Sequence, residues 1–186
     1  MSKLAKALTA AAGNAGGTLG YVEDVFSTYL YEGNNSTQAI NNGLDLDGEG
    51  GLVWIKERAG TGNEGHRLLD TERGPTKVLM SNNTGANYTI DGGFDSFTST
   101  GFTLKADNGW SINSASPATY ASWTFRKAEK FFDVVTYTGD GVAGRTLAHN
   151  LGSVPAVMFI KRTSASGDDW AVYHSSLGAT QLLALN

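Results

Sequence analysis

The strongest constraint on the fold is a series of short apolar runs, rich in β-branched and aromatic residues, between clusters of glycine and small polar residues. The runs cover residues 25–31, 52–55, 120–125, 134–137 and 156–160. Such runs are typical of strands, and 24 glycines against 3 prolines supply many tight turns. The pattern predicts an all-β fold, an antiparallel β-sandwich. In runs 52–55 and 156–160 both faces are apolar, which predicts central strands covered on both sides.

The first residues follow a different pattern, which predicts a short N-terminal α-helix. Residues 2–12 are strong helix formers that end at a glycine, and Leu4 and Leu8 lie one turn apart. Because a helix of about three turns is marginal alone in water, we expect residues 1–20 to form an anchoring helix and a glycine-rich linker that dock on a partner. The expected anchor residues are Leu4 and Leu8 at the contact, with Lys3 and Lys6 at its rim.

An internal repeat is the most informative feature of the remaining chain. Three pairs of segments match in the same order and at nearly the same offset: 31–33 with 137–139, 54–56 with 159–161, and 74–82 with 178–186. Three ordered matches indicate a duplication rather than chance. We therefore expect tandem modules, a first β-sandwich at 21–130 and the start of a second, homologous module at 131–186, with almost no linker between them.

The second copy lacks the strand-like segments that follow residue 82 in the first copy. A sandwich without these closing strands leaves apolar faces uncovered. We therefore expect the second module to be incomplete as given and the native chain to continue beyond Asn186. The side chains expected to be uncovered are Val157, Phe159, Trp170 and Leu182.

Composition argues against several classes of function. The formal net charge is −4, and only 17% of residues are charged, so the basic patch of a phosphate-led nucleic-acid binder is missing. The short basic run 126–130 is interpreted as a solvated strand end. The absence of cysteine excludes disulfides, thiolate metal sites and a cysteine nucleophile. No apolar run approaches the roughly 18 to 20 residues that span a membrane, so we expect no membrane insertion.

Few residues have the spacing of a catalytic or metal site. The three histidines lie in or beside predicted loops without a metal-binding or triad spacing, and we interpret them as hydrogen-bonded loop residues: His66, His149 and His174. Asp45, Asp47 and Glu49 suggest a calcium loop superficially, but the EF-hand spacing is absent and the second copy has no acid there. We therefore expect no metal, no cofactor and no enzymatic activity.

Carbohydrate binding is the main alternative function. A sandwich can hold a sugar by stacking it on an exposed aromatic ring. Trp110 and Trp170 lie in polar, loop-rich surroundings, so both are possible glycan contacts. A position in the core is the interpretation we favour for each, because large aromatic side chains are usually buried.

Segments of both copies carry a resemblance to a known family. They are FSTYLY (26–31), GLVWIK (51–56), DTERG (70–74), FTSTGFTL (97–104) and ASWTFRK (121–127) in the first copy, and YTG (137–139), LGSVP (151–155) and DWAVYH (169–174) in the second. They resemble the concanavalin A-like modules of marine bacteriophage structural proteins, found in tail fibres and other virion appendages of phages that infect cyanobacteria and other marine bacteria. The resemblance implies a jelly-roll sandwich, non-enzymatic as a rule, often in trimeric appendages.

The resemblance and the repeat lead to one expected function. We expect a non-enzymatic structural component of a tailed-phage virion, the tail-proximal part of a tail fibre or appendage. It would bind other tail proteins through residues 1–20, form a homo-oligomer (a trimer by analogy) and present distal host-binding modules. The alternatives are an adhesin that contacts host surface glycans directly and a glycan depolymerase.

Overall fold

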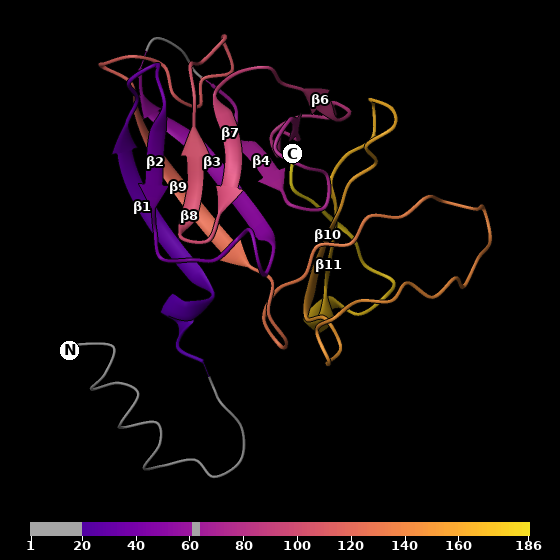
Figure 1. Ribbon diagram of the computed structural model, residues 1–186. Helices are drawn as coiled ribbons and strands as arrows, with labels where there is room; N and C mark the ends of the chain where they lie inside the picture. The colour runs from indigo at the N-terminus through magenta and orange to yellow at the C-terminus, as the bar shows by residue number, and fades with distance from the viewer. Residues whose placement is uncertain (1–19, 61–63) are drawn as a thin grey trace, which may run out of the picture.

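The computed structural model describes residues 20–60 and 64–186 (Figure 1). The predicted N-terminal helix, with Leu4, Leu8, Lys3 and Lys6, lies outside the described residues. The described residues form antiparallel strands and two short 3-10 helices, η1 (Val22–Asp24) and η2 (Ser175–Leu177). The predicted all-β class is therefore confirmed. No helix in the described part of the chain is long and apolar enough to cross a membrane.

The largest sheet depends on a strand from far along the chain. Its order is β1-β9-β3-β4, and the strands are β1 (Phe26–Glu32), β9 (Thr119–Arg126), β3 (Gly51–Ala59) and β4 (Arg67–Asp70). The eight residues of β9 pair antiparallel with β1 on one side and with β3 on the other. The strand that closes the sheet is thus the last of its four strands in the sequence.

A second sheet covers the inner face of the first. Its order is β2-β8-β7, and the strands are β2 (Gln38–Asn41), β8 (Gly101–Leu104) and β7 (Phe94–Thr98). Figure 1 shows these three strands in front of β9 and β3. A two-stranded sheet of β5 (Lys77–Val78) and β6 (Tyr88–Thr89) lies at one end.

The hydrophobic core fills the space between these two sheets. Alternation on β3 places Val53 and Ile55 inward, where both are fully buried. The other members of the core include Tyr31, Ile40, Leu69, Phe94, Phe102, Leu104, Ile112 and Tyr120. Each large apolar side chain buried in this way contributes about 1.5–3 kcal/mol of transfer free energy. The core therefore joins residues that are up to 89 positions apart in the chain, as in the paired Tyr31 and Tyr120.

A buried amide ties the loops at one end of the core. Asn113 is fully buried, and its Nδ2 donates to the carbonyl oxygens of Ser36 (2.8 Å) and Lys105 (3.0 Å) and to Asn34 Oδ1 (3.2 Å). Its Oδ1 accepts the backbone N–H of Asn34 at 3.1 Å. One fully buried side chain thus links its own loop to the loop between β1 and β2 and to the residue that follows β8.

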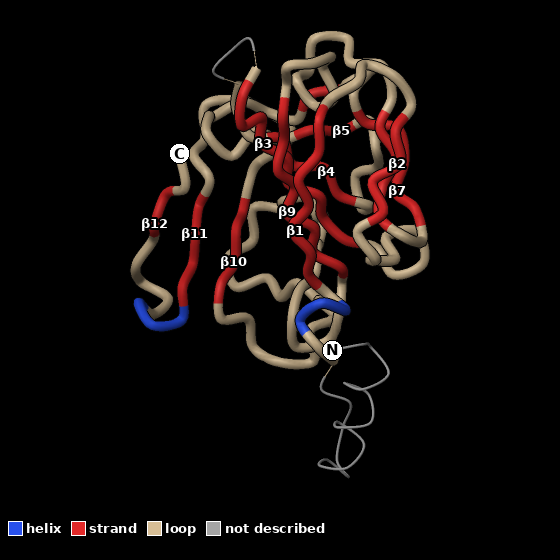
Figure 2. The backbone as a smooth tube through the Cα atoms, turned by 90° about the vertical axis from the view of Figure 1, so that its left-hand side faces the viewer, coloured by secondary structure: helices blue, strands red, loops and turns tan. Residues whose placement is uncertain are grey.

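A third sheet is built from the second copy of the repeat. Its order is β10-β11-β12, with β10 (Val157–Ile160), β11 (Ala171–His174) and β12 (Leu183–Ala184). Figure 2 shows it beside the sandwich rather than within it. Val157, Phe159 and Leu182 are 42%, 54% and 70% exposed, as expected for uncovered side chains, whereas Trp170 is buried.

Two strand predictions in the second copy are corrected by the structure. The run 134–137 is not a strand, and β10 is an edge strand whose four residues are all exposed, not a central strand. Both differences have one cause. In the first copy β1 and β3 pair with β9, and no strand of residues 127–186 takes the place of β9 between their counterparts.

We predict that Asn113→Ala destabilises the protein by roughly 1–3 kcal/mol, because a fully buried amide and its hydrogen bonds to the carbonyl groups of Ser36 and Lys105 are lost. Chemical denaturation monitored by tryptophan fluorescence measures the change. The matched control is Asn108→Ala, at an exposed position on the same loop between β8 and β9, which should change stability by less than about 0.5 kcal/mol. Equal effects of the two substitutions would contradict the role assigned to Asn113.

Candidate functional site

The outer face of the largest sheet carries a row of aromatic side chains. Because side chains alternate along a strand, the inward Val53 and Ile55 put Trp54 on the opposite face. Trp54 packs edge-on against Trp123 of β9, with ring centroids 6.3 Å apart and an interplanar angle of 73°. Both rings are partly buried, so this face of the sheet is already partly covered.

His66 continues this row and is held neutral. Trp54 Nε1 donates to His66 Nδ1 at 2.8 Å, so Nδ1 carries no proton. Burial lowers the pKa of His66, and the nearby Lys56 and Arg67 charges lower it further. His66 is therefore a structural acceptor for the indole.

Trp170 of the second copy covers one end of the aromatic face. Its side chain is 5% exposed and packs with the buried Leu68 and Leu79, and against the partly buried Leu52 and Trp54. Its indole Nε1 donates to the carbonyl oxygen of Met80 at 2.8 Å. We call this contact the junction: Trp170 with Leu52, Trp54, Leu68, Leu79 and Met80.

Loops from the two copies are hydrogen-bonded beside the junction. Gly167 N donates to Thr84 O at 2.9 Å, and Asn87 N donates to Thr163 O at 3.1 Å. The N–H of Ala86 also donates to Ser166 Oγ at 3.1 Å. The buried Trp170 indole is thus bordered by loops of both copies, whose backbone N–H and C=O groups are hydrogen-bonded across the contact.

A lysine holds the opposite side of the contact between the copies. Lys127 Nζ lies 2.6 Å from Glu72 Oε1 and 3.4 Å from Asp133 Oδ1. The hydrogen bond that Lys127 donates to Glu72 raises the pKa of Lys127, with further contributions from the charges of Glu72 and Asp133. Asp133 Oδ2 in turn accepts the N–H of Asn150 at 2.7 Å. The start of the second copy is therefore fixed to the end of β9.

The strand register repeats the sequence alignment. The paired residues form one cross-strand row in each copy: Trp54, Leu68 and Leu79 in the first, and Phe159, Val172 and Leu183 in the second. Each member of the first row aligns with the corresponding member of the second. The matching segments thus build the same local ladder in both copies.

The asparagine that ends each matching segment also has the same contact. Asn82 Oδ1 accepts the N–H of His66 at 3.1 Å, and Asn186 Oδ1 accepts the N–H of Trp170 at 2.8 Å. Trp170 therefore occupies the position of His66 in the repeat. In the first copy His66 accepts a hydrogen bond from Trp54 of the neighbouring strand β3. In the second copy Trp170 packs with Leu68 and Leu79 of the first copy.

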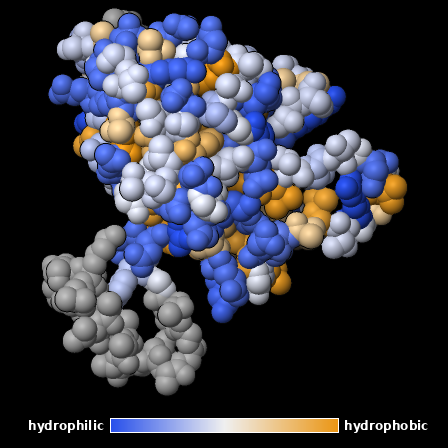
Figure 3. All heavy atoms as spheres, viewed as in Figure 1, coloured by the Kyte–Doolittle hydropathy of each residue, from blue (hydrophilic) through white to orange (hydrophobic). Residues whose placement is uncertain are grey.

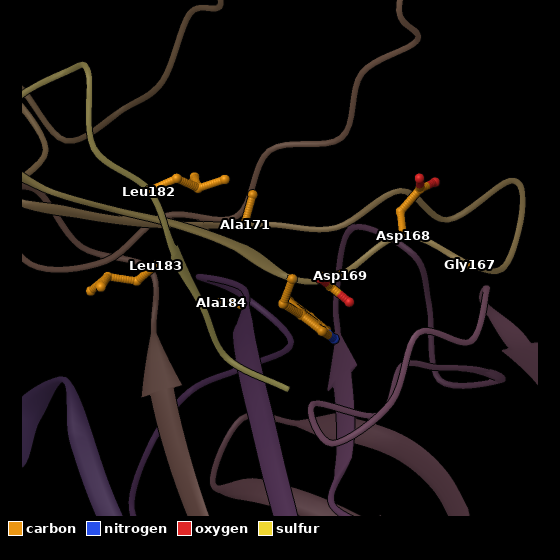
Figure 4. A pocket seen from close by; sticks show the side chains of 8 residues that line it. Gly167, Asp168, Asp169, Ala171, Leu182, Leu183 and Ala184 are labelled. Carbon is orange, nitrogen blue, oxygen red and sulfur yellow. The ribbon is translucent and has the colours of Figure 1, made fainter.

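A cavity of about 420 Å³ lies against β12, the start of β11 and the loop before β11, with Trp170 among its lining residues (Figure 4). Ala171, Leu182, Leu183 and Ala184 line it from the strands, and Figure 4 shows Asp168 and Asp169 on the loop at its far side. Both acids have internal partners. Asp168 pairs with Arg162 at 3.1 Å, and Asp169 Oδ1 accepts from Asn186 Nδ2 at 3.3 Å. The two carboxylates therefore serve to hold the loop and the end of β12.

The structure places the two predicted glycan contacts in different clusters. Trp110 is half-buried against the main core, and its ring lies 6.1 Å from that of Tyr88. Its backbone is fixed by Asp107 Oδ1, which accepts its N–H, and by Arg67 Nε, which donates to its carbonyl. Trp170 lies in the junction, where its ring has no free face for a sugar.

The remaining sequence candidates have local structural contacts. His149 Nδ1 accepts the N–H of Leu151 at 3.3 Å, and His174 Nδ1 accepts the N–H of Ser176 at 3.2 Å at the start of η2. Asp45 Oδ1 accepts from Gly48 N at 2.8 Å. Within residues 20–60 and 64–186, no group of three or more acids or histidines is placed to hold a metal ion.

Glu57 is an unusual titratable group that the sequence reasoning missed. It is 6% exposed on β3, and its Oε1 has no hydrogen-bond partner among the described residues. Burial raises the pKa of Glu57, and the nearby Glu64 raises it further, while Lys56 and Arg67 act in the opposite direction. Its inward position was readable from the sequence, since it continues the alternation of Val53 and Ile55.

Comparison with known proteins gives one family. Residues 22–186 match a family described as a domain of unknown function, DUF7483. The chain belongs to this family. The DUF7483 match extends over both copies of the repeat and over the junction between them. No curated protein and no solved structure matches the chain.

We predict that Trp170→Ala loosens the third sheet from the rest of the protein. The substitution removes a buried aromatic ring, a change that typically costs about 3–5 kcal/mol. Amide hydrogen exchange should therefore speed up in β11 and β12 and remain slow in β9. The control is Tyr137→Ala, at a residue that is 51% exposed, which should leave exchange in β11 unchanged. Unchanged exchange in Trp170→Ala would contradict the junction.

We predict that Glu57→Gln stabilises the protein at neutral pH. A raised carboxyl pKa means that the folded state binds the proton more tightly than the unfolded state, so stability falls as pH rises. The fall begins near the ordinary glutamate pKa of about 4.3 and ends above the raised pKa. Denaturation at several pH values should show the advantage of Glu57→Gln growing across this window. The exposed Glu32→Gln is the control, and a constant difference for Glu57→Gln would contradict the assignment.

Proposed function

We propose that this chain is a non-enzymatic structural component of a tailed-phage virion, made of tandem jelly-roll modules that are stacked rigidly on one another. The observation that carries the proposal is the junction. Trp170, at the position of His66 in the repeat, is buried against Leu68 and Leu79 of the preceding copy and bonds Met80. A repeat whose largest side chain is buried against the neighbouring repeat is suited to building a stiff array.

The mechanism in this proposal is mechanical. The junction and the Lys127 ion pairs fasten the second copy on two sides of the first, so rotation about residues 127–133 breaks buried or charge-assisted contacts. The paired loops around Thr84 and Gly167 add direction-specific hydrogen bonds. Successive modules would then keep a fixed orientation and hold distal parts at a defined distance from the tail.

The proposal assigns a role to each part of the chain. Residues 1–20 attach to tail proteins through Leu4 and Leu8, residues 21–130 form the first module, and residues 131–186 begin the next. The virion assignment and a trimeric state rest on the resemblance to phage appendage modules. The burial of Trp170 favours a structural role over a glycan adhesin, because one of the two candidate stacking residues serves the contact between copies.

The test uses purified phage particles whose genome encodes this chain. Antibody fragments raised against residues 21–126 should decorate the tail or its appendages in electron micrographs. A truncation that lacks residues 1–20 should fold but fail to join the particles. Particles without the chain, or full incorporation of the truncated protein, would contradict the proposed location and anchor respectively.

A further inference from the structure

Two asparagine–glycine pairs of the first copy have the same glycine conformation. They are Asn42-Gly43 and Asn108-Gly109. Each glycine is exposed with a φ of 86°, and a Cβ atom added at either one would meet nothing within 4 Å. A glycine leaves its backbone nitrogen open to the side chain that precedes it, because it has no Cβ to shield that nitrogen. The two pairs are therefore alike on the glycine side.

Hydrogen bonds hold both groups of the pair Asn42-Gly43. Asn42 Nδ2 donates to Thr124 Oγ1 at 2.8 Å, and Asn42 Oδ1 accepts the N–H of Leu44 at 3.2 Å. The N–H of Gly43 donates to Thr100 O at 3.1 Å. Thr124 is fully buried on β9, so its hydroxyl is a fixed acceptor. At this pair the side-chain amide and the glycine nitrogen are both tied to other parts of the fold.

The pair Asn108-Gly109 has none of these bonds. Both residues are exposed, and they lie in the loop between β8 and β9. Within residues 20–60 and 64–186, no hydrogen bond reaches the Asn108 side chain or the N–H of Gly109. The amide carbon of Asn108 and the nitrogen of Gly109 are thus free to approach each other.

The neighbouring residues fix the two ends of this pair. Asp107 N donates to Asn35 Oδ1 at 2.7 Å, and Asp107 Oδ1 accepts the N–H of Trp110 at 2.9 Å. Asp107 Oδ2 accepts the Ser114 hydroxyl at 2.5 Å. Figure 1 shows the loop beyond the tip of β8, and Figure 3 shows mostly hydrophilic residues over that end of the sandwich. The loop therefore presents the pair to solvent.

We propose that Asn108 is a site of spontaneous deamidation from which Asn42 is protected. The Gly109 nitrogen attacks Cγ of Asn108 and bonds to it, and the side-chain nitrogen leaves as ammonia with the proton of the Gly109 N–H. Water then opens the cyclic imide at one or the other of its carbonyl carbons, which gives aspartate or isoaspartate. Water is the co-reactant of this sequence. The inference does not depend on the virion assignment.

The reaction changes the charge of the loop and, in one product, its length. Either product adds a carboxylate beside Asp107, whose own oxygens already accept hydrogen bonds. Isoaspartate also carries the main chain through the former side chain, which inserts a methylene group between Asp107 and Trp110. The bond from the Trp110 N–H to Asp107 Oδ1 spans this segment, so the isoaspartate form loses it. Trp110 packs against the main core, so the loop becomes less firmly attached as the protein ages.

The test incubates the purified full chain in neutral buffer, with and without denaturant. Peptide mapping by mass spectrometry with fragmentation follows each asparagine over time. In the folded chain Asn108 should convert about tenfold or more faster than Asn42, because several hydrogen bonds must break before Asn42 reacts. In denaturant the two rates should converge, since glycine follows both residues. Equal rates in the folded chain, or the same difference with and without denaturant, would overturn the proposal.

Two variants of β9 test the protection of Asn42. Thr124→Val removes the acceptor of Asn42 Nδ2, so Asn42 should deamidate faster while Asn108 keeps its rate. Ser122→Ala is the matched control, at a buried hydroxyl on the same face of β9 whose recorded partner is Tyr29 O, and should leave both rates unchanged. An unchanged Asn42 rate in Thr124→Val, or equal effects of the two substitutions, would overturn the protection by this bond.

Amide exchange tests the consequence for the loop. Chromatography separates the isoaspartate form from the unmodified chain. The Trp110 N–H should exchange faster in the isoaspartate form than in Asn108→Asp, which has the same charge and an ordinary main chain. Equal exchange in the two forms would contradict the loss of the bond to Asp107.

Discussion

The structure depends on the insertion of β9 between β1 and β3. This pairing joins residues 26–32 with residues 119–126, and the chain between them contains the strands of the opposing β2-β8-β7 sheet. The entropy cost of closing this long loop is offset by a core that buries Tyr31, Tyr120 and the phenylalanines of the second sheet. The same insertion places Trp123 beside Trp54 and so creates the outer aromatic face.

The second copy shows what happens to the same sequence pattern without this strand. Its local ladder of β10, β11 and β12 forms, because those pairings are short and close in the chain. The counterpart of β1 stays irregular, and β10 remains an exposed edge. The junction compensates in part, since Trp170 obtains its cover from Leu68 and Leu79 of the first copy. Contact with a distant segment, and not the local sequence alone, thus decides whether an apolar residue is buried.

Several site features were legible in the sequence for clear physical reasons. The repeat identified the matching segments 74–82 and 178–186, whose final asparagines, Asn82 and Asn186, make the same hydrogen bond. The apolar run 52–55 predicted a central strand, and alternation along β3 places its Val53 and Ile55 inward. Glu57 was missed although it continues that alternation, because a carboxylate invites interpretation as solvent-exposed. Trp170 was weighed as a sugar contact because its neighbours in the sequence are polar, and its partners lie about 90 residues away at Met80.

The sequence by itself determined the all-β class, the strand-like runs 25–31, 52–55 and 120–125, and the matching order of the two copies, because local propensity and side-chain alternation are encoded in neighbouring residues. Only the tertiary structure decided that 134–137 has no strand partner, that β10 is an edge, and that Trp170 lies in a contact between copies. These outcomes depend on which distant segment reaches a given edge or face. Backbone pairing and burial depend on two segments that are distant in the chain, and the residues of one segment do not by themselves specify which other segment it contacts.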